Sequence, residues 1–340
     1  MEKKLSVIIP VFNTEKFIER CINSVISCES EEIEIIIVND GSTDSSREIV
    51  TKNFNDERIS IIDKSNGGLA SARNKGVKEA NGEYVLHLDS DDYLDNGVIE
   101  EILNGIESGS EVIIFDIKVV SDNGDLIRLW KDTTLEYDTQ LDNKSYLKEF
   151  FLRRGSASVA NKAFKRTLYL DFGIWHPENI SYGEDGSTMP RLVSNANCVY
   201  KIKGKYYNYV QHSVSMMGSS TNDVKKIRDY HITLNIIEDY FKNKDWFHDY
   251  SFSVKYLYLY SKLNKWHMSS GAVQRNPEIK KAYDLFLSDV RLWKNKLNFK
   301  DYSLSYIYYL FIFYKINWRL GEFLKRMRLN LLRLYRGGKH

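Results

Sequence analysis

The stretch LSVIIPVF, residues 5–12, decides the fold of the N-terminal half of the chain. It is a continuous apolar run, without the alternation that marks a sheet with one face in water. Such a run is typical of a parallel strand covered by helices on both faces. Apolar side chains then recur at helical spacing from Phe17 to Ile26. A buried strand followed by an amphipathic helix is the repeating unit of an α/β protein.

The same alternation continues to about residue 120. Buried strands are predicted at IEIIIVND (33–40), ISIID (59–63), YVLHLD (84–89) and EVIIFDIKVV (111–120), with helices near Ala70–Ala80 and Val98–Ile106. This order predicts an α/β fold with a mainly parallel sheet and flanking helices. The later part of the chain has a helical pattern rich in aromatic residues. We therefore expect two domains, residues 1–215 and a helical C-terminal region, residues 216–340.

The composition excludes several classes of protein. The net charge is only +2, so the molecule as a whole is no obvious nucleic-acid binder. The three cysteines have no metal-ligand spacing, and Cys21 is predicted to be a small buried apolar residue in a reducing compartment. No signal peptide is recognisable, and no segment reaches the ~20 apolar residues of a membrane-spanning helix. These features predict a cytoplasmic location.

Polar clusters follow four of the predicted strands. They read FNTE, NDGSTD, KSNGG and DSDD along the chain. In open α/β sheets, ligands bind beyond the carboxyl ends of the strands. A site is therefore expected at this edge of the sheet before any single motif is considered.

Two of these clusters suit a nucleotide, although each has a simpler interpretation. Asp40 ends a strand, where a carboxylate can accept hydrogen bonds from a base or ribose. In SNGGLASARNKG, residues 65–76, the two glycines allow close backbone approach, the helix start favours a phosphate, and Arg73 adds a cation. The alternatives are a capped helix start and a plain turn before a helix.

The acidic clusters also allow two interpretations. In LDSDD, Asp89 and Asp91 suit Mg²⁺ or Mn²⁺, which take oxygen ligands, but a solvated loop with a helix cap fits as well. In YGEDG, either carboxylate is a general base or an N-terminal helix acid. His212 is the best-placed histidine for a metal, and Lys162 could face a phosphate, although structural and surface roles are more usual.

In order and spacing, five motifs together resemble family 2 glycosyltransferases with the GT-A fold. The motifs are VIIPVFNTEKFIERCINSVI, IIIVNDGSTDSS, NGGLASARNKG, LHLDSDDYL and GED, within residues 4–215. The resemblance implies a UDP-sugar donor of a hexose or N-acetylhexosamine, a Mn²⁺ or Mg²⁺ ion, and inversion at the anomeric carbon. It further implies a glycan acceptor, lipid-linked in many such pathways, in bacterial surface polysaccharide synthesis such as that of capsule or O-antigen.

The resemblance also implies roles for individual residues. The nucleotide-sugar would contact Pro10, Phe12, Glu15, Asp40, Asn66, Gly67, Arg73, Asp89 and Ser90, with Asp40 on the uracil. Asp91 would bind the metal, with His212 as a further candidate ligand, and Asp185 would be the catalytic base. The chain departs from the family in having Phe12 where Tyr is common. It also has Gly186 where a bulky residue often follows the acidic pair.

The end of the chain is strongly basic, since residues 315–340 carry a net charge of +7. An apolar stripe at helical spacing runs along this segment: Leu320, Phe323, Leu324, Met327, Leu331, Leu334 and Tyr335. A basic amphipathic helix of this kind predicts binding to an anionic membrane surface, on the inner face of the cell membrane. The alternative is a terminal helix that packs on its own domain or in a homodimer.

Two other functions compete with glycosyl transfer. One is a non-catalytic nucleotide-sugar-binding or scaffold protein, which the joint presence of Asp89, Asp91 and Asp185 argues against. The other is a nucleotidyltransferase, which would require a glycine-rich basic loop after the first strand. The sequence PVFNTEKF has no glycine at that place.

Overall fold

The computed structural model describes residues 2–132, 136–151, 155–212, 224–242 and 244, with single positions at 277, 320, 323, 324 and 327. Its strands are β1 (Leu5–Val11), β2 (Ile33–Asn39), β3 (Ile59–Asp63), β4 (Tyr84–His87), β5 (Tyr93–Leu94), β6 (Val112–Ser121), β7 (Leu126–Trp130), β8 (Thr139–Asp142), β9 (Lys162–Lys165) and β10 (Cys198–Gln211). Its helices are α1 (Ile18–Ile26), α2 (Ser46–Asn53), α3 (Leu69–Glu79), α4 (Val98–Ile106), α5 (Asn143–Phe151), α6 (Thr167–Leu170), α7 (Glu184–Val193) and α8 (Val224–Phe241).

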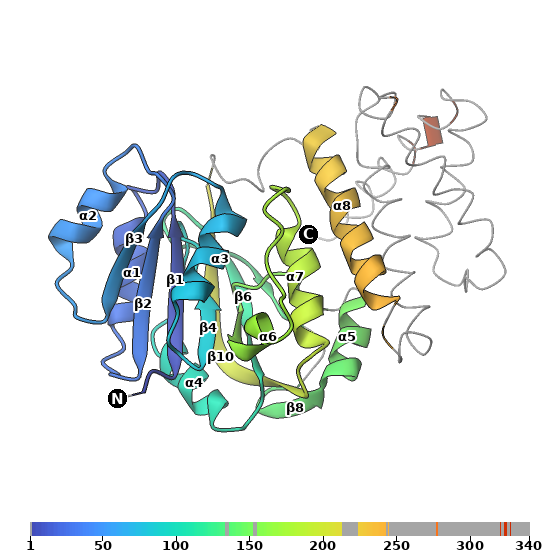
Figure 1. The fold of residues 1–340 in the computed structure, drawn as a ribbon, viewed down its shortest axis with the longest axis horizontal. Coiled ribbons are helices and arrows are strands. Elements are labelled where there is room, and N and C mark those ends of the chain that lie inside the picture. The colour runs from blue at the N-terminus through green and yellow to red at the C-terminus, as the bar shows by residue number, and fades with distance from the viewer. Residues whose placement is uncertain are drawn as a thin grey trace. The chain divides into compact units, whose positions relative to one another are not determined.

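The strands form one mixed sheet in the order β3-β2-β1-β4-β9-β6-β10-β5, with β7 beside β6 and β8 beside β10 (Figure 1). β3, β2, β1 and β4 are all parallel. β9 runs antiparallel to both β4 and β6. From β1 the chain proceeds outward to β2 and β3 and then returns to place β4 on the other side of β1. The carboxyl ends of β1 and β4 therefore form a topological switch point, where ligands of such sheets bind.

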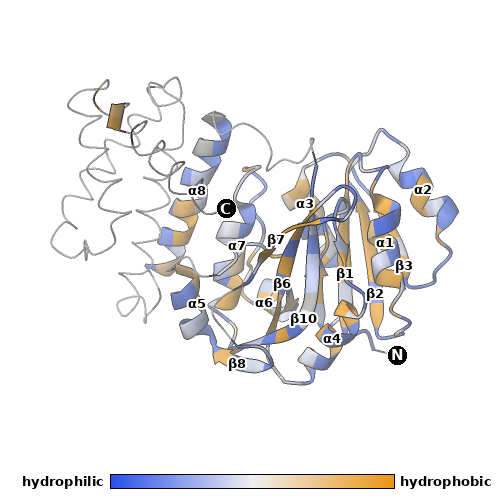
Figure 2. Cartoon of the chain, turned by 180° about the vertical axis from the view of Figure 1, so that it is seen from behind, coloured by the Kyte–Doolittle hydropathy of each residue, from blue (hydrophilic) through white to orange (hydrophobic). Residues whose placement is uncertain are grey.

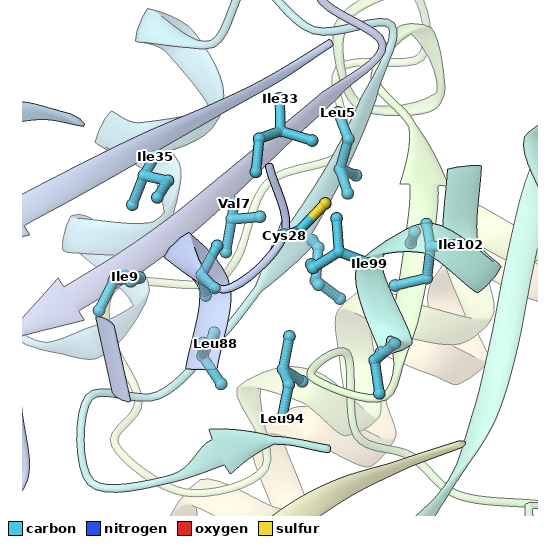
Figure 3. Packing of buried hydrophobic residues seen from close by; sticks show 14 of the residues in the cluster. Leu5, Val7, Ile9, Cys28, Ile33, Ile35, Leu88, Leu94, Ile99 and Ile102 are labelled. Carbon is cyan, nitrogen blue, oxygen red and sulfur yellow. The ribbon is translucent and has the colours of Figure 1, made fainter. Parts of the chain in front are cut away.

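Helices cover both faces of the parallel strands, which is why the strand residues are apolar without alternation. On one face, side chains of β1 and β2 pack with α1 and α4 in the main core (Figure 3). On the other face, α3 lies on β1 so closely that a Cβ at Gly76 would be 2.3 Å from the Ile8 side chain. Any side chain at this position would force α3 away from the sheet.

The core confirms the prediction for Cys21, which is fully buried in it. Burial raises the pKa of its thiol well above the ordinary value. Figure 2 shows the strands β1, β2 and β3 coloured largely hydrophobic, whereas the surrounding helices carry both colours. Within the described residues, no helix is long and apolar enough to cross a membrane.

The chain divides into two compact units. The first comprises residues 1–219 and 232–253, and the second comprises residues 220–231 and 254–340. The predicted boundary at residue 215 lies in a segment, residues 213–223, outside the described residues. Most of the predicted C-terminal helix also lies outside them. Positions 320, 323, 324 and 327 of its apolar stripe are helical.

Candidate active site

The turn that begins α3 is held by the carboxylate that follows β2. Asp40 is 2% exposed, and its Oδ1 accepts hydrogen bonds from the Gly67 N–H (2.9 Å) and Lys64 Nζ (2.5 Å). Its Oδ2 accepts a hydrogen bond from the Gly68 N–H at 2.8 Å. Gly68 has φ +85°, a conformation that side chains disfavour. The structure thus brings Asp40, Asn66 and Gly67 together at the edge of the sheet, and the contact of Asp40 with uracil stays a prediction.

The segment after β1 supplies the next predicted residues. Pro10 is buried within β1, whereas Phe12 is 47% exposed at its end. The carboxylate of Glu15 accepts the N–H of the residue that caps α2, at 3.0 Å. Asn13, which the sequence analysis missed, has φ +54° and accepts the Thr43 N–H at 2.8 Å. The only signal for it is that Asn adopts this conformation more readily than most residues.

The DSDD segment after β4 directs its four side chains to four different places. Asp89 pairs with Arg73, Ser90 accepts a hydrogen bond from Thr14, Asp91 contacts His212, and Asp92 is bound by β10. Each of the three carboxylates thus has its own partner, and these contacts reduce the repulsion between them. The Ser90–Thr14 bond, at 3.0 Å, also ties this segment to the loop after β1.

Asp92 is not a helix cap, contrary to the alternative considered for this cluster. Its oxygens accept the Val210 N–H at 2.7 Å and the Tyr207 hydroxyl at 2.5 Å, both from β10. Gly97 instead precedes α4, with φ +79°. Burial raises the pKa of Asp92 well above its ordinary value, and the Asp91 charge adds to this effect. Asp92 therefore anchors the motif to β10.

Asp91 and His212, the two predicted metal ligands, lie side by side. His212 Nε2 is 3.0 Å from Asp91 Oδ2, and the imidazole stacks on Phe17 at 4.7 Å. Burial and then the charge of Asp89 raise the pKa of Asp91, so its charge is poorly compensated by the protein. Two ligands of one small cation lie about 3 Å apart at metal–ligand distances near 2.1 Å. The pair therefore fits a divalent cation, although the described residues contain no group of three or more such side chains.

Arg73 lies between the two acidic motifs and is 1% exposed. Its Nη2 donates to Asp89 Oδ1 at 2.7 Å, and its Nη1 donates to Asp185 Oδ1 at 2.7 Å and to Glu184 Oε1 at 3.4 Å. These carboxylates raise the pKa of Arg73 despite its burial. We call Arg73, Asp89, Glu184 and Asp185 the Arg73 cluster. Its guanidinium faces carboxylates, and its predicted contact with the nucleotide stays a prediction.

The acidic pair of the GED motif begins α7. Gly183, with φ +86°, precedes the helix and has no side chain with which to cap it. Besides Arg73, Asp185 is bound by the Val159 N–H, which donates to Oδ2 at 3.1 Å. Burial raises the pKa of Asp185, against the opposing effect of Arg73. Burial, together with the charge of Asp185, raises the pKa of Glu184 to about 7.

The small residue after the acidic pair has a structural reason. A Cβ at Gly186 would lie 3.4 Å from the Thr233 methyl group of α8, and the Thr233 hydroxyl donates to the Gly183 carbonyl at 3.0 Å. The C-terminal half of α8 thus occupies the space that a bulky side chain would require. The closeness of α8 explains why this chain has a glycine at position 186, where a bulky residue is common in the family.

Lys162 does not face a phosphate. It is completely buried, and its Nζ pairs with Asp132 Oδ2 at 2.6 Å. It also donates to the Ser156 and Ser158 carbonyls, at 3.1 and 2.9 Å. A second buried pair adjoins it, Lys201 with Asp116 at 3.1 Å. We call Asp116, Asp132, Lys162 and Lys201 the Asp132 cluster; it holds the loop from which Val159 reaches Asp185.

Two buried histidines, which the sequence analysis also missed, lie behind the acidic pair. Their rings meet edge to face at 5.2 Å, His87 Nε2 is 3.0 Å from the Tyr169 hydroxyl, and His176 Nδ1 is 3.9 Å from Asp185 Oδ1. Burial lowers the pKa of both histidines well below the ordinary value, so both are neutral. The side chain of Asn74 holds the backbone N–H and carbonyl of His176, each at 2.9 Å.

Known proteins are similar to this chain in sequence and in fold. The profile of the family described as Glycosyl transferase family 2 matches residues 6–169. Over 61% of its length the chain is 31% identical to poly(ribitol-phosphate) beta-N-acetylglucosaminyltransferase TarS of Staphylococcus aureus, and covers 35% of that protein. Over 62% of its length it is 42% identical to glycosyltransferase GlyA of Streptococcus pneumoniae, and covers 31% of that protein. The chain thus spans about a third of the length of these relatives.

A solved structure extends the similarity to three dimensions. The crystal structure of S. aureus TarS in complex with UDP matches with a TM-score of 0.59 and 26% sequence identity. The match covers 71% of this chain and 66% of that chain. The mainly parallel sheet with flanking helices is therefore common to both proteins.

Proposed function

Residues 6–169 belong to glycosyl transferase family 2, and from this membership we propose that the protein is an inverting glycosyltransferase. It moves a hexose or N-acetylhexosamine from a UDP-sugar to a hydroxyl group of a glycan acceptor in surface polysaccharide synthesis. The fold is of the GT-A type. One observation carries the proposal: Asp185, held by Arg73 and the Val159 N–H, shares a guanidinium with Asp89 of the DSDD motif.

The donor proposal draws on the similarity to TarS. TarS is named as a beta-N-acetylglucosaminyltransferase and has been crystallised with UDP. In this chain, Asp40, Asn66 and Gly67 stand together at the switch-point edge, where a uridine would lie beside the glycine turn. Phe12, exposed at the end of β1, offers an aromatic face but no hydroxyl group.

The chemistry follows from the placement of one carboxylate. The acceptor hydroxyl attacks the anomeric carbon, its oxygen forms the new glycosidic bond, and Asp185 takes its proton. The bond between the anomeric carbon and the phosphate oxygen breaks, and UDP leaves with the electron pair. Attack from the face opposite the leaving group inverts the configuration. Burial raises the pKa of Asp185, which makes its carboxylate a better base than an exposed aspartate.

Asp91 and His212 would hold a Mn²⁺ or Mg²⁺ ion together with diphosphate oxygens and water. When bound, the ion neutralises charge on the departing diphosphate. Calorimetry of UDP binding with and without Mn²⁺ tests this assignment. Replacing Asp91 with Ala should abolish the metal dependence of UDP binding, and UDP binding that is metal-independent in the unchanged protein would contradict it.

The proposed reaction is tested by a screen of UDP-sugars for slow donor hydrolysis, followed by transfer to oligosaccharide acceptors. Asp185→Asn should retain UDP binding and lose about 10²–10⁴-fold in transfer rate. Asp171→Asn, at an exposed position, is the matched control and should transfer normally. Retained transfer in Asp185→Asn would remove it from the role of base. Firm UDP binding with neither hydrolysis nor transfer would favour the non-catalytic alternative.

We propose further that the basic C-terminal segment associates with the inner face of the cell membrane, where a lipid-linked acceptor would lie. Among its described positions, Phe323 and Met327 are 62% and 47% exposed, which supports an apolar stripe at the surface. Deleting residues 316–340 should release the protein from anionic vesicles. Unchanged partitioning would favour packing on the protein or in a homodimer.

A further inference from the structure

The Arg73 cluster contains one cation and three carboxylates. The two terminal nitrogens of Arg73 are both used, one by Asp89 and the other by Asp185 and Glu184. The remaining nitrogen, Nε, is buried and has no hydrogen-bond partner among the described residues. With 1% of its surface exposed, Arg73 has almost no contact with solvent. This geometry differs from that of an arginine that binds phosphate, because the donors of such an arginine must be accessible to the phosphate.

The two strong hydrogen bonds join elements that are distant in sequence. Asp89 follows β4 and belongs to the motif expected to contact the donor, whereas Asp185 opens α7. Both distances are 2.7 Å, typical of charge-assisted pairs. A planar fork of donors holds two carboxylates in a fixed mutual orientation, whereas an ammonium group is a compact point charge with freely rotating donors. Arg73 therefore links the donor motif to the predicted base.

Asp185 is surrounded by groups from several elements, which together define its charge state. Those facing it are Arg73 from α3, Asp89 after β4, Lys162 from β9, Tyr169 from α6, His176 before α7 and Glu184 of its own helix. Arg73 is the cation in contact with it, whereas Lys162 is paired with Asp132. His176 and Tyr169 are neutral. Burial and the charge of Asp89 favour the protonated form of Asp185. Arg73 is the main group that favours its ionised form.

We propose that Arg73 is a positioning residue for the base and not a ligand of the diphosphate. It fixes the orientation and the ionised state of Asp185 and, through Asp89, aligns the base with the donor sugar. This inference rests on the proposed function, because it assigns Arg73 to the reaction that Asp185 performs.

The test separates the two roles of Arg73 through binding and turnover. In Arg73→Lys, the Kd for UDP and the KM for the donor should stay within about threefold of their values in the unchanged protein, because Arg73 does not contact UDP or the donor in this proposal. Its kcat should fall about 10²-fold, since a misplaced base is costly. The acid limb of the pH–rate profile should move to higher pH, because the pKa of Asp185 rises without the fork. A loss of UDP affinity of about tenfold or more, or an unmoved acid limb, would overturn the proposal.

Arg58→Lys is the matched control. The side chain of Arg58 is 10% exposed and binds the Asp56 carboxylate at 2.7 Å, but Arg58 lies directly before β3 and forms no ion pair with the Arg73 cluster among the described residues. The Arg58→Lys substitution should lower the Tm of the protein and leave both the acid limb of the pH–rate profile and kcat unchanged. A shifted limb in this variant would show that any buried arginine has the effect, which would also overturn the proposal.

A measurement independent of turnover keeps the inference separate from the proposed function. When Arg73 is present, Asp185→Asn should lower the Tm, because it weakens the ion pair between the two residues. In the Arg73→Met background it should raise the Tm, because it relieves an unpaired carboxylate. If the unchanged protein transfers no sugar, the proposed function fails while this reversal still supports the Arg73–Asp185 coupling. If transfer occurs but the reversal and the pH shift are absent, the inference fails alone.

Discussion

The Asp132 cluster and the Arg73 cluster are both buried groups of charges, but they differ in balance. The Asp132 cluster has two carboxylates and two ammonium groups, each no more than 2% exposed. The Arg73 cluster has one guanidinium for three carboxylates, whose side chains are 29%, 12% and 20% exposed. The balanced cluster is closed and its partners are all internal. The excess of negative charge in the other remains partly open at the switch-point edge.

The difference separates a structural role from a chemical one. In the Asp132 cluster each charge has its counter-charge and further hydrogen bonds, so burial stabilises one arrangement of the loop before β9. In the Arg73 cluster three carboxylates share one cation, and burial, together with repulsion from a neighbouring carboxylate, raises the pKa values of Glu184 and Asp185. Perturbed carboxylates of this kind are typical of functional sites. Three measurements can break or sharpen this distinction.

The largest effect is expected from Lys162→Met, which leaves Asp132 buried without its partner. The free energy of unfolding should fall by about 3–5 kcal/mol, measured by urea denaturation. Lys165→Met, at the partly exposed lysine three residues on, should change it by less than about 1 kcal/mol. A loss below about 1 kcal/mol for Lys162→Met would mean that the Asp132 cluster is not the structural anchor described.

An intermediate effect, dependent on pH, is expected from Glu184→Gln. The pKa of Glu184 is raised from 4.5 to about 7 in the folded protein. Between pH 4.5 and about pH 7, the folded protein therefore keeps a proton on Glu184 that the unfolded chain has lost. Stability therefore falls as pH rises from about 4.5 to about 7 through this residue. Glutamine mimics the protonated form, so the variant should gain on the order of 2 kcal/mol over the unchanged protein between pH 5 and pH 7.5.

Urea denaturation of both proteins at the two pH values measures that gain. The exposed Glu79, replaced by Gln, is the control and should show no difference between pH 5 and pH 7.5. An equal difference for Glu184→Gln at both pH values would mean that the Arg73 cluster compensates its charges as fully as the Asp132 cluster does.

The smallest effect is expected from Arg47→Met. Arg47 binds Asp63 through two nitrogens at 2.8–2.9 Å, a geometry as good as that of Arg73, but both side chains are about half exposed. Water screens such a pair, so unfolding should change by about 0.5 kcal/mol and transfer should be unaffected. A loss comparable with that of Lys162→Met would show that geometry, and not burial, controls the energetics of these charges.

Much of the fold was predictable because its signals are local. The strand at 59–63 and the helix at 98–106 were predicted with the observed bounds, and the helix near Ala70–Ala80 differs from α3 by one residue at each end. Strands β5, β7, β8 and β9 were not recognised. They are short or antiparallel, and β7 is exposed along its whole length, so none has the buried apolar run that marks β1 or β2.

The site was predictable in part. The motifs predicted that Asp40 and Asp91 follow strands at one edge of the sheet, and the structure brought Asp91 and His212 into contact. The burial of Lys162 could not be anticipated, because its partner Asp132 is separated from it by thirty residues in the sequence. A lysine on the surface and one in a buried pair have the same local sequence signal.

By itself, the sequence determined the alternation of strands and helices and the polar clusters that follow the strands. These depend on apolar periodicity and turn residues within a few positions of each other. Only the tertiary structure decided which charge meets which. Arg73 lies 16 residues from Asp89 and 112 from Asp185, and the fold brings α3, the end of β4 and the start of α7 together. Electrostatic partners are chosen by distance in space, which is set by sheet order and helix packing.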